Sequence, residues 1–157
     1  MIVRKKFTFE AAHRLRAHEG RCAGLHGHSY KVEVFIEGMV CESTGMVVDF
    51  GQIKSSLAPF IDQFDHSLIV SEHDPLAHGG KVWYGQIHEL NPRFIITPYE
   101  PTAEMMAAHF YWSAHYALNV TRVRVWETET GWAECSSLIT CHFNRTLFSK
   151  ACKMLET

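Results

Sequence analysis

Alternating apolar and polar side chains predict two long strands in the first part of the chain. Residues 2–13 alternate with Phe7 and Phe9 on one side, and this row ends at His13. A polar loop follows, and from His28 onward every second residue is apolar, which is typical of a half-buried antiparallel strand. The apolar side of this second strand is formed by Tyr30, Val32, Val34 and Ile36. A turn at 42–45 then leads to a predicted short strand at 46–48.

Helical spacing replaces alternation in two later segments. Asp49 and Gln52 resemble a capping box, and apolar residues recur every three or four positions after them, which predicts a helix over about 50–63 with Pro59 disturbing its last turn. A second helix is predicted from about 105 to 118, because residues 101–104 have a helix-start composition with Glu104 in the first turn. Residues 121–128 and 132–139 alternate again and are expected to pair as a hairpin.

The order of these elements predicts an α+β fold, a four-stranded antiparallel sheet with two helices on one face. The segment 71–101 is rich in Pro, Gly, His and Asn and is expected to be a long excursion, in which 93–97 could form a short strand. Residues from about 141 form a tail. A chain of 157 residues, 46 % of them hydrophobic, fits one domain over 1–157. Such a small open sheet has exposed edges, which favours a homo-oligomer.

Composition excludes several classes of partner. The formal net charge is −2, so no global positive field would recruit nucleic acid or an acidic membrane surface. No run of about 18 apolar residues and no signal peptide is present, which predicts a cytoplasmic protein without a membrane partner. The five cysteines lack Cys-x-x-Cys pairs, which argues against a disulfide framework and a thiolate zinc site. Eleven histidines are many for a chain of this length.

Three histidines have the spacing of metal ligands. His26 and His28 are two residues apart, which places both imidazoles on the same face of an extended segment. His13 ends the first strand in phase with its apolar side and can converge on this pair if the strands are neighbours. Three neutral imidazoles without a fourth protein ligand predict an open, catalytic type of zinc site. The alternative is a polar turn at His26–His28 and a hydrogen-bonded strand end at His13.

Four further residues carry candidate chemistry. Cys22 lies in a polar, Gly-containing loop four residues before His26, where a cysteine beside a cation can act as general acid or base. Asp65 and His66 are adjacent and can form a proton relay, although such a dipeptide is also common in surface turns. Glu127 lies in phase with the buried side of its strand, so it either binds a ligand edge with paired N–H and NH₂ donors or forms a salt bridge.

Together these motifs resemble a known family. They are Phe9-Glu10-Ala11-Ala12-His13-Arg14-Leu15, Cys22-Ala23-Gly24-Leu25-His26-Gly27-His28, Val48-Asp49-Phe50, Asp65-His66, Pro101-Thr102-Ala103-Glu104 and Trp126-Glu127-Thr128. The chain is similar to the 6-pyruvoyl tetrahydropterin synthase family from residue 7 to about 138, and within it to the bacterial 6-carboxytetrahydropterin synthases of queuosine biosynthesis. The resemblance implies the tunnelling fold, in which subunit sheets join into trimeric barrels that stack as a hexamer with active sites between subunits.

The resemblance also implies a cofactor and residue roles. Zn²⁺ would be held by His13, His26 and His28. Cys22 would accept a proton, His66 with Asp65 would relay it, and Glu127 would grip the pterin ring. Thr102 and Glu104 are further substrate-binding candidates.

The implied activity is that of a zinc-dependent lyase acting on 7,8-dihydroneopterin triphosphate. The leading expectation is 6-carboxy-5,6,7,8-tetrahydropterin as product, with release of acetaldehyde and triphosphate. The alternatives are 6-pyruvoyl tetrahydropterin, formed without loss of carbon, a non-catalytic paralogue that binds pterin and zinc, and an unrelated three-histidine zinc hydrolase that activates water. The motifs are shared by both synthases, so their spacing does not separate the two products.

Overall fold

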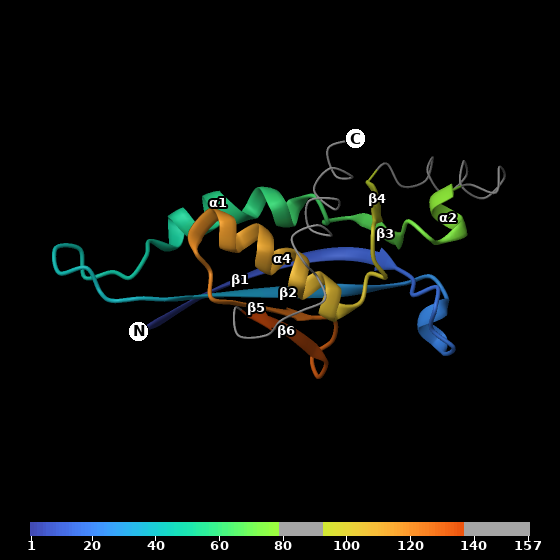
Figure 1. Ribbon diagram of the computed structural model, residues 1–157, viewed down its shortest axis with the longest axis horizontal. Helices are drawn as coiled ribbons and strands as arrows, with labels where there is room; N and C mark the ends of the chain where they lie inside the picture. The colour runs from blue at the N-terminus through green and yellow to red at the C-terminus, as the bar shows by residue number, and fades with distance from the viewer. Residues whose placement is uncertain (79–92, 137–157) are drawn as a thin grey trace.

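A mixed sheet forms one layer of the molecule, and two helices cover one of its faces (Figure 1). The computed structural model describes residues 1–78 and 93–136. The predicted tail from about 141, and the end of the last predicted strand at 137–139, lie outside the described residues. Within the described residues, none of the helices has the length and apolar character needed to cross a membrane.

Two long strands form the centre of the sheet. β1 (Ile2–His13) and β2 (His26–Glu37) pair antiparallel over their whole length, from Ile2 opposite Glu37 to His13 opposite His26. The predicted alternation is confirmed, because Phe9 and Tyr30 are buried on the helix side and their rings stack with centroids 4.7 Å apart. The second strand begins two residues earlier than expected, so all three candidate metal ligands lie on these two strands.

Four shorter strands complete the sheet in the order β4-β3-β1-β2-β5-β6. On one side, β5 (Arg122–Trp126) pairs antiparallel with β2, and β6 (Trp132–Ser136) pairs antiparallel with β5, as the predicted hairpin requires. On the other side, β3 (Ser67–Ser71) is parallel to β1, and β4 (Phe94–Thr97) is parallel to β3. The sheet is therefore mixed and six-stranded, whereas four antiparallel strands were predicted.

The short strand considered at 93–97 is confirmed as β4, whereas β3 was missed because it is buried on both faces. Every residue of β3 is buried, with Ile69 in the main core and Leu68 and Val70 in a second apolar cluster on the opposite side. Such strands have no alternation, and a short apolar run is not distinguishable from other buried segments by its period. The expected excursion at 71–101 accordingly contains the end of β3, the short helix α2 (Pro75–His78) and β4. The strand predicted at 46–48 does not form, and Met46 is half exposed.

The two predicted helices form where expected. α1 (Phe50–Asp62) is capped by the Asp49 carboxylate, which accepts hydrogen bonds from the backbone N–H groups of Gly51 and Gln52. α4 (Ala103–Leu118) is capped by the Thr102 hydroxyl, which accepts from the Met105 N–H at 3.3 Å. α1 packs on β1, α4 packs on β5 and β6, and the helices contact each other. The main core lies between these helices and the sheet.

Candidate metal centre and active site

The three candidate metal ligands converge at one end of the two long strands. His13 is directly opposite His26 across the β1–β2 pair, and Ala11 is opposite His28. Residues that face each other in this way project to the same side of a sheet, so the three imidazoles form one group. Their candidate ligand nitrogens all lie within 4.8 Å of one another, and the ring centroids are 4.5–5.1 Å apart. The predicted convergence of His13 on the pair is therefore confirmed in its geometry.

The glycine between the two histidines of β2 is required by the closeness of the strands. A Cβ added to Gly27 would lie 3.0 Å from the carbonyl oxygen of Ala11, which is backbone and cannot swing away. Gly27 pairs with Ala12 in the ladder, one position from the His13–His26 pair. A glycine at this position thus allows β2 to approach β1 closely enough for the imidazoles to meet.

Backbone carbonyls fix the tautomers of two of the rings. Nδ1 of His13 donates to the carbonyl oxygen of Pro101 at 2.8 Å, and Nδ1 of His26 donates to that of Gly24 at 2.8 Å. In a neutral imidazole this leaves the lone pair on Nε2, the arrangement commonly found in histidines that bind metal. Nε2 of His13 is buried and has no hydrogen-bond partner among the described residues. The group therefore presents a donor atom that fits a metal ion.

The environment also favours the neutral form of His13 and His28. Burial lowers the pKa of His13 from 6.5 to about 4, against the opposing effect of its hydrogen bond to Pro101 and with smaller lowering contributions from the other two rings. Burial, and then the neighbouring His26, lowers the pKa of His28. Neutral imidazole is the form that coordinates metal, so at neutral pH protons do not compete for the lone pairs of His13 and His28.

Glu127 lies beside this group, directly after β5. Its Oε1 atom is 4.0 Å from Nε2 of His13, but His13 is neutral at pH 7, so the two do not form an ion pair. Burial, and then the charge of Glu104, raises the pKa of Glu127, and its Oε1 is buried without a hydrogen-bond partner among the described residues. The salt bridge considered as the alternative for Glu127 is absent from the described residues, which leaves a carboxylate oxygen free to accept from a ligand.

Tyr30 is a component of this region that the sequence analysis did not single out. Its ring lies 5.8 Å from that of His13 and 5.5 Å from that of His28. Its hydroxyl is buried without a hydrogen-bond partner among the described residues, and burial, followed by the charge of Glu127, raises its pKa. Its position two residues after His28, on the same side of β2, was a usable signal. The sequence offers no signal for the Pro101 carbonyl as a partner of His13, because the two residues are 88 positions apart.

Asp65 and His66 form the predicted pair. Oδ2 of Asp65 is 2.9 Å from Nδ1 of His66, and the turn is tied to β1 because Oδ1 of Asp65 accepts from the N–H of Glu10 at 2.8 Å. This backbone N–H, and then His66, holds the pKa of Asp65 below its usual value. His66 has a φ of 54°, a left-handed conformation that is uncommon outside glycine and is often found at functional sites. Its largely exposed ring and His28 line the same cleft of about 340 Å³.

Cys22 and the two α4 candidates have different surroundings. Cys22 lies in a single turn of 3-10 helix, Arg21–Ala23, and is partly exposed; its backbone carbonyl accepts from the N–H of Leu15 at 2.9 Å. In the part of the chain that the structure describes, no hydrogen bond or ion pair joins Cys22 or His66 to the three histidines. Thr102 caps α4, so part of its hydrogen-bonding capacity is already used, whereas Glu104 is exposed.

A search of known proteins gave consistent matches. The family model described as 6-pyruvoyl tetrahydropterin synthase matches residues 2–137. A 6-carboxy-5,6,7,8-tetrahydropterin synthase of Haemophilus influenzae is 33% identical over 138 residues, which cover 84% of this chain and 96% of the relative. The protein of the same name from Aquifex aeolicus is 30% identical over 161 residues, covering 84% and 95%.

Solved structures share the architecture. An uncharacterised protein of Wolinella succinogenes superposes with a TM-score of 0.70 at 26% identity, covering 87% of this chain and 98% of its own. The 6-pyruvoyl tetrahydropterin synthase of Caenorhabditis elegans gives a TM-score of 0.64 at 20% identity, covering 87% and 95%. The second match is a likeness of fold.

Proposed function

Because this chain belongs to the 6-pyruvoyl tetrahydropterin synthase family, we propose that it is a 6-carboxy-5,6,7,8-tetrahydropterin synthase. The substrate would be 7,8-dihydroneopterin triphosphate, and acetaldehyde and triphosphate would be released. Relatives with this name match the chain over nearly their whole length, which supports this product over 6-pyruvoyl tetrahydropterin. The reaction would serve queuosine and related 7-deazapurine biosynthesis in the cytoplasm, within a single domain spanning 1–157.

One observation carries the proposal. Two buried polar atoms, Nε2 of His13 and Oε1 of Glu127, lie 4.0 Å apart, and neither has a hydrogen-bond partner within residues 1–78 and 93–136. Buried polar groups are usually paired, so an unpaired lone pair beside an unpaired carboxylate oxygen indicates a site completed by ligands. A metal ion on the three imidazoles and a donor-bearing ring on Glu127 would complete it.

The residues would divide the work as follows. His13, His26 and His28 would hold Zn²⁺, and the chemistry that this ion supplies when bound is Lewis-acid polarisation of hydroxyl oxygens. Glu127 would accept hydrogen bonds from the N–H and NH₂ groups of the pterin ring and so orient the substrate. Thr102 and Glu104, near the same strand end, would contribute further contacts to the substrate.

Proton transfer would be shared by two groups. The Cys22 thiolate would move protons between the substrate side chain and the ring, and His66 would receive or return them. The carboxylate of Asp65 orients the His66 ring through its contact with Nδ1, which leaves Nε2 for exchange. Since Cys22 and His66 make no polar contact with the three histidines within the described chain, substrate or a second subunit would bring these groups together. We propose a hexamer of two trimers, assembled through the edges of the sheet.

The test is a product analysis. Purified protein is incubated with 7,8-dihydroneopterin triphosphate, and pterins are identified by mass while acetaldehyde is measured separately. We expect 6-carboxytetrahydropterin with one equivalent of acetaldehyde. A pyruvoyl product without acetaldehyde would reassign the chain to the other synthase activity, and pterin binding without turnover would make it a non-catalytic paralogue. His26→Ala should abolish turnover, whereas His73→Ala, which changes an exposed histidine outside the group, should not.

A further inference from the structure

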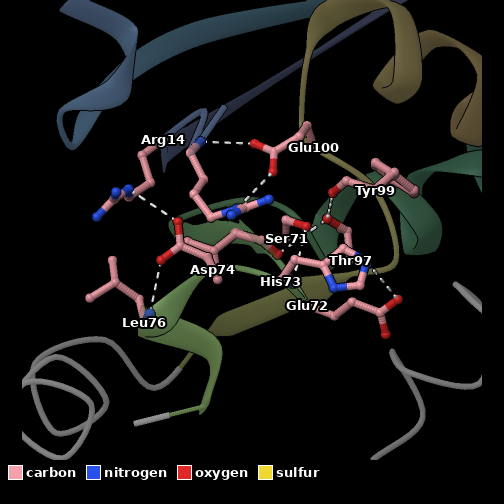
Figure 2. A network of polar contacts seen from close by, with 11 residues as sticks. Arg14, Ser71, Glu72, His73, Asp74, Leu76, Thr97, Tyr99 and Glu100 are labelled. Carbon is pink, nitrogen blue, oxygen red and sulfur yellow. Dashed lines mark hydrogen bonds and ion pairs between the residues drawn. The ribbon is translucent and has the colours of Figure 1, made fainter. Parts of the chain in front are cut away.

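Two pairs of arginine and carboxylate lie directly after His13, where β1 ends. Arg14 Nε lies 3.1 Å from Oδ2 of Asp74, and Arg16 Nε lies 3.7 Å from Oε1 of Glu100. The backbone N–H of Arg16 also donates to Oε2 of Glu100 at 2.8 Å. Figure 2 shows Arg14 and Asp74 pointing toward each other. The strand end that bears His13 is thus attached to two segments that are distant in sequence.

Asp74 is held rigidly on its side of this contact. Its side chain is fully buried, and Oδ1 accepts from the N–H of Leu76 at 2.8 Å. Its own N–H donates to the carbonyl of Ser71 at 2.9 Å, at the end of β3. A buried carboxylate is strongly destabilising without a cation, and Arg14 supplies one. The Arg14 and Asp74 atoms are close but lack hydrogen-bond alignment, so their attraction is mainly that of charge.

Glu100 is the neighbour in sequence of the residue that accepts the His13 hydrogen bond. It directly precedes Pro101, whose carbonyl accepts from Nδ1 of His13 at 2.8 Å. The preceding segment is fixed to β3, because the N–H of Glu72 donates to the carbonyl of Thr97 at 2.6 Å. The buried hydroxyl of Thr97 lies within hydrogen-bond distance of the carbonyl of Tyr99, at 2.7 Å (Figure 2). The Pro101 carbonyl is therefore part of a tied framework and not a free loop.

We propose that Asp74 and Glu100 are positioning residues for His13. Through Arg14 and Arg16 they hold the end of β1 against Pro101, so that Nδ1 of His13 keeps its hydrogen bond and Nε2 stays directed at the metal position. This inference rests on the proposed metal centre. It also gives the beginning of the 71–101 excursion a role in the site, since Asp74 lies there.

The two residues should differ in their effect. The groups that support metal-bound histidines typically contribute about 10- to 100-fold to metal affinity. Asp74 reaches His13 only indirectly, through Arg14, the next residue in the chain after His13. We therefore expect Asp74→Asn to weaken metal binding by about 10-fold, the lower end of that range. The Arg16–Glu100 pair is partly exposed, and exposed pairs are weak, so Glu100→Gln should weaken binding by about two- to five-fold.

The experiment measures metal affinity and stability in the full chain. Co²⁺ and Zn²⁺ affinities are determined by competition with a chelator, and the visible spectrum of bound Co²⁺ reports the ligand geometry. Melting temperatures are measured with and without metal. Matched controls are Asp62→Asn and Glu37→Gln, which change carboxylates of weaker ion pairs at 3.8 and 3.9 Å, away from His13. Arg14→Gln should behave like Asp74→Asn, and Arg14→Lys should restore part of the affinity.

The outcomes separate the possible roles. A positioning residue reduces the rise in melting temperature that metal produces, whereas a purely structural residue lowers the melting temperature equally with and without metal. Unchanged metal affinity and an unchanged Co²⁺ spectrum in Asp74→Asn would overturn the inference while leaving the metal centre intact. If Asp74→Asn does not fold, the same measurements on Arg14→Gln and Glu100→Gln test the inference: unchanged metal affinity and an unchanged Co²⁺ spectrum in both would overturn it. If the unaltered chain binds no metal, the proposed function fails together with the inference.

Discussion

Replacement of Glu127 by glutamine should make the protein more stable and less active. Glu127 has a half-buried side chain whose Oε1 is buried without a partner among the described residues, and burial and the charge of Glu104 both disfavour its ionised form. Glutamine keeps the shape and removes the charge. If Glu127 formed a salt bridge instead, the same change would lower stability, so the sign of the effect distinguishes the two roles.

The size of the stability effect follows from the buried charge, because an unpaired buried carboxylate costs more than the unpaired amide that replaces it. A buried polar group left without a hydrogen bond costs about 1–3 kcal/mol, and Glu127 retains 26 % exposure of its side chain. We therefore expect the free energy of unfolding of the metal-free Glu127→Gln protein to rise by about 1 kcal/mol at pH 7.

The effect should depend on pH in a defined direction. The pKa of Glu127 is raised in the folded state, so its carboxyl is protonated more readily when folded than when unfolded. The stability associated with that proton is fully present below the unfolded pKa and is lost as the pH rises through the folded one. Glutamine resembles the protonated form. The advantage of Glu127→Gln should therefore be largest at neutral pH and should disappear below about pH 4, near the unfolded pKa of a glutamate.

Ligand binding should change in the opposite sense. The glutamine amide would present an NH₂ group to a pterin edge that also consists of donors, leaving one buried donor unpaired. An unpaired buried donor costs about 1–3 kcal/mol of binding free energy, which is a loss of roughly 5- to 150-fold in pterin affinity.

Urea denaturation and direct pterin titration test both parts on one preparation. Glu129→Gln is the matched control in the same turn, because Glu129 is exposed and a hydrogen bond from Lys31, and then the charge of that lysine, holds its pKa below the usual value. Its replacement should not raise stability and should leave pterin affinity unchanged. A Glu127→Gln protein that is less stable and binds pterin normally would refute the assignment.

Other expected results concern metal, proton transfer, acid stability and assembly. His28→Ala should lose the bound metal, which elemental analysis should otherwise find at close to one equivalent per chain. Cys22→Ala should lower kcat by about 10²- to 10⁴-fold while metal content and pterin affinity stay unchanged. Burial lowers the pKa of His13 and of His109 from 6.5 to about 4, so urea denaturation of metal-free protein should show stability lost as the pH falls from 6.5 to 4, by roughly 3 kcal/mol per group. Light scattering should give a mass near six chains, and a fully active monomer would contradict an active site between subunits.

Features of the fold and the site that have a local signal in the sequence could be predicted. The convergence of His13 with His26 and His28 followed from a period of two along two strands that pair end to end, and the structure confirms it. The α+β class and the tunnelling fold are confirmed by the matches in structure. The position of Glu127 on the buried side also followed from its phase with β5.

Features that depend on contacts between distant segments were missed. β3 is short and fully buried, and it has no alternation that would reveal it, whereas β4 coincides with the short strand considered at 93–97. The hydrogen bond from His13 to Pro101 and the pairing of Arg14 with Asp74 join segments that only the folded chain brings together. Sequence periodicity carries no information about such partners, because their positions depend on the path of the chain between them.

Two carboxylates, Glu33 on β2 and Glu127 directly after the neighbouring strand β5, differ in their hydrogen-bond partners. Glu33 lies on the face opposite the helices and is buried, yet it accepts from Arg4 at 2.9 Å and from the indole N–H of Trp126 at 3.1 Å. Glu127, at the end of the neighbouring strand, leaves an oxygen unpaired beside an unpaired nitrogen of His13. Glu33 is therefore paired by side chains of the same sheet, whereas Oε1 of Glu127, after the end of β5, has no partner among the described residues. Two unpaired polar atoms that lie close together, on a sheet that elsewhere pairs a buried carboxylate, are expected of a site that ligands complete.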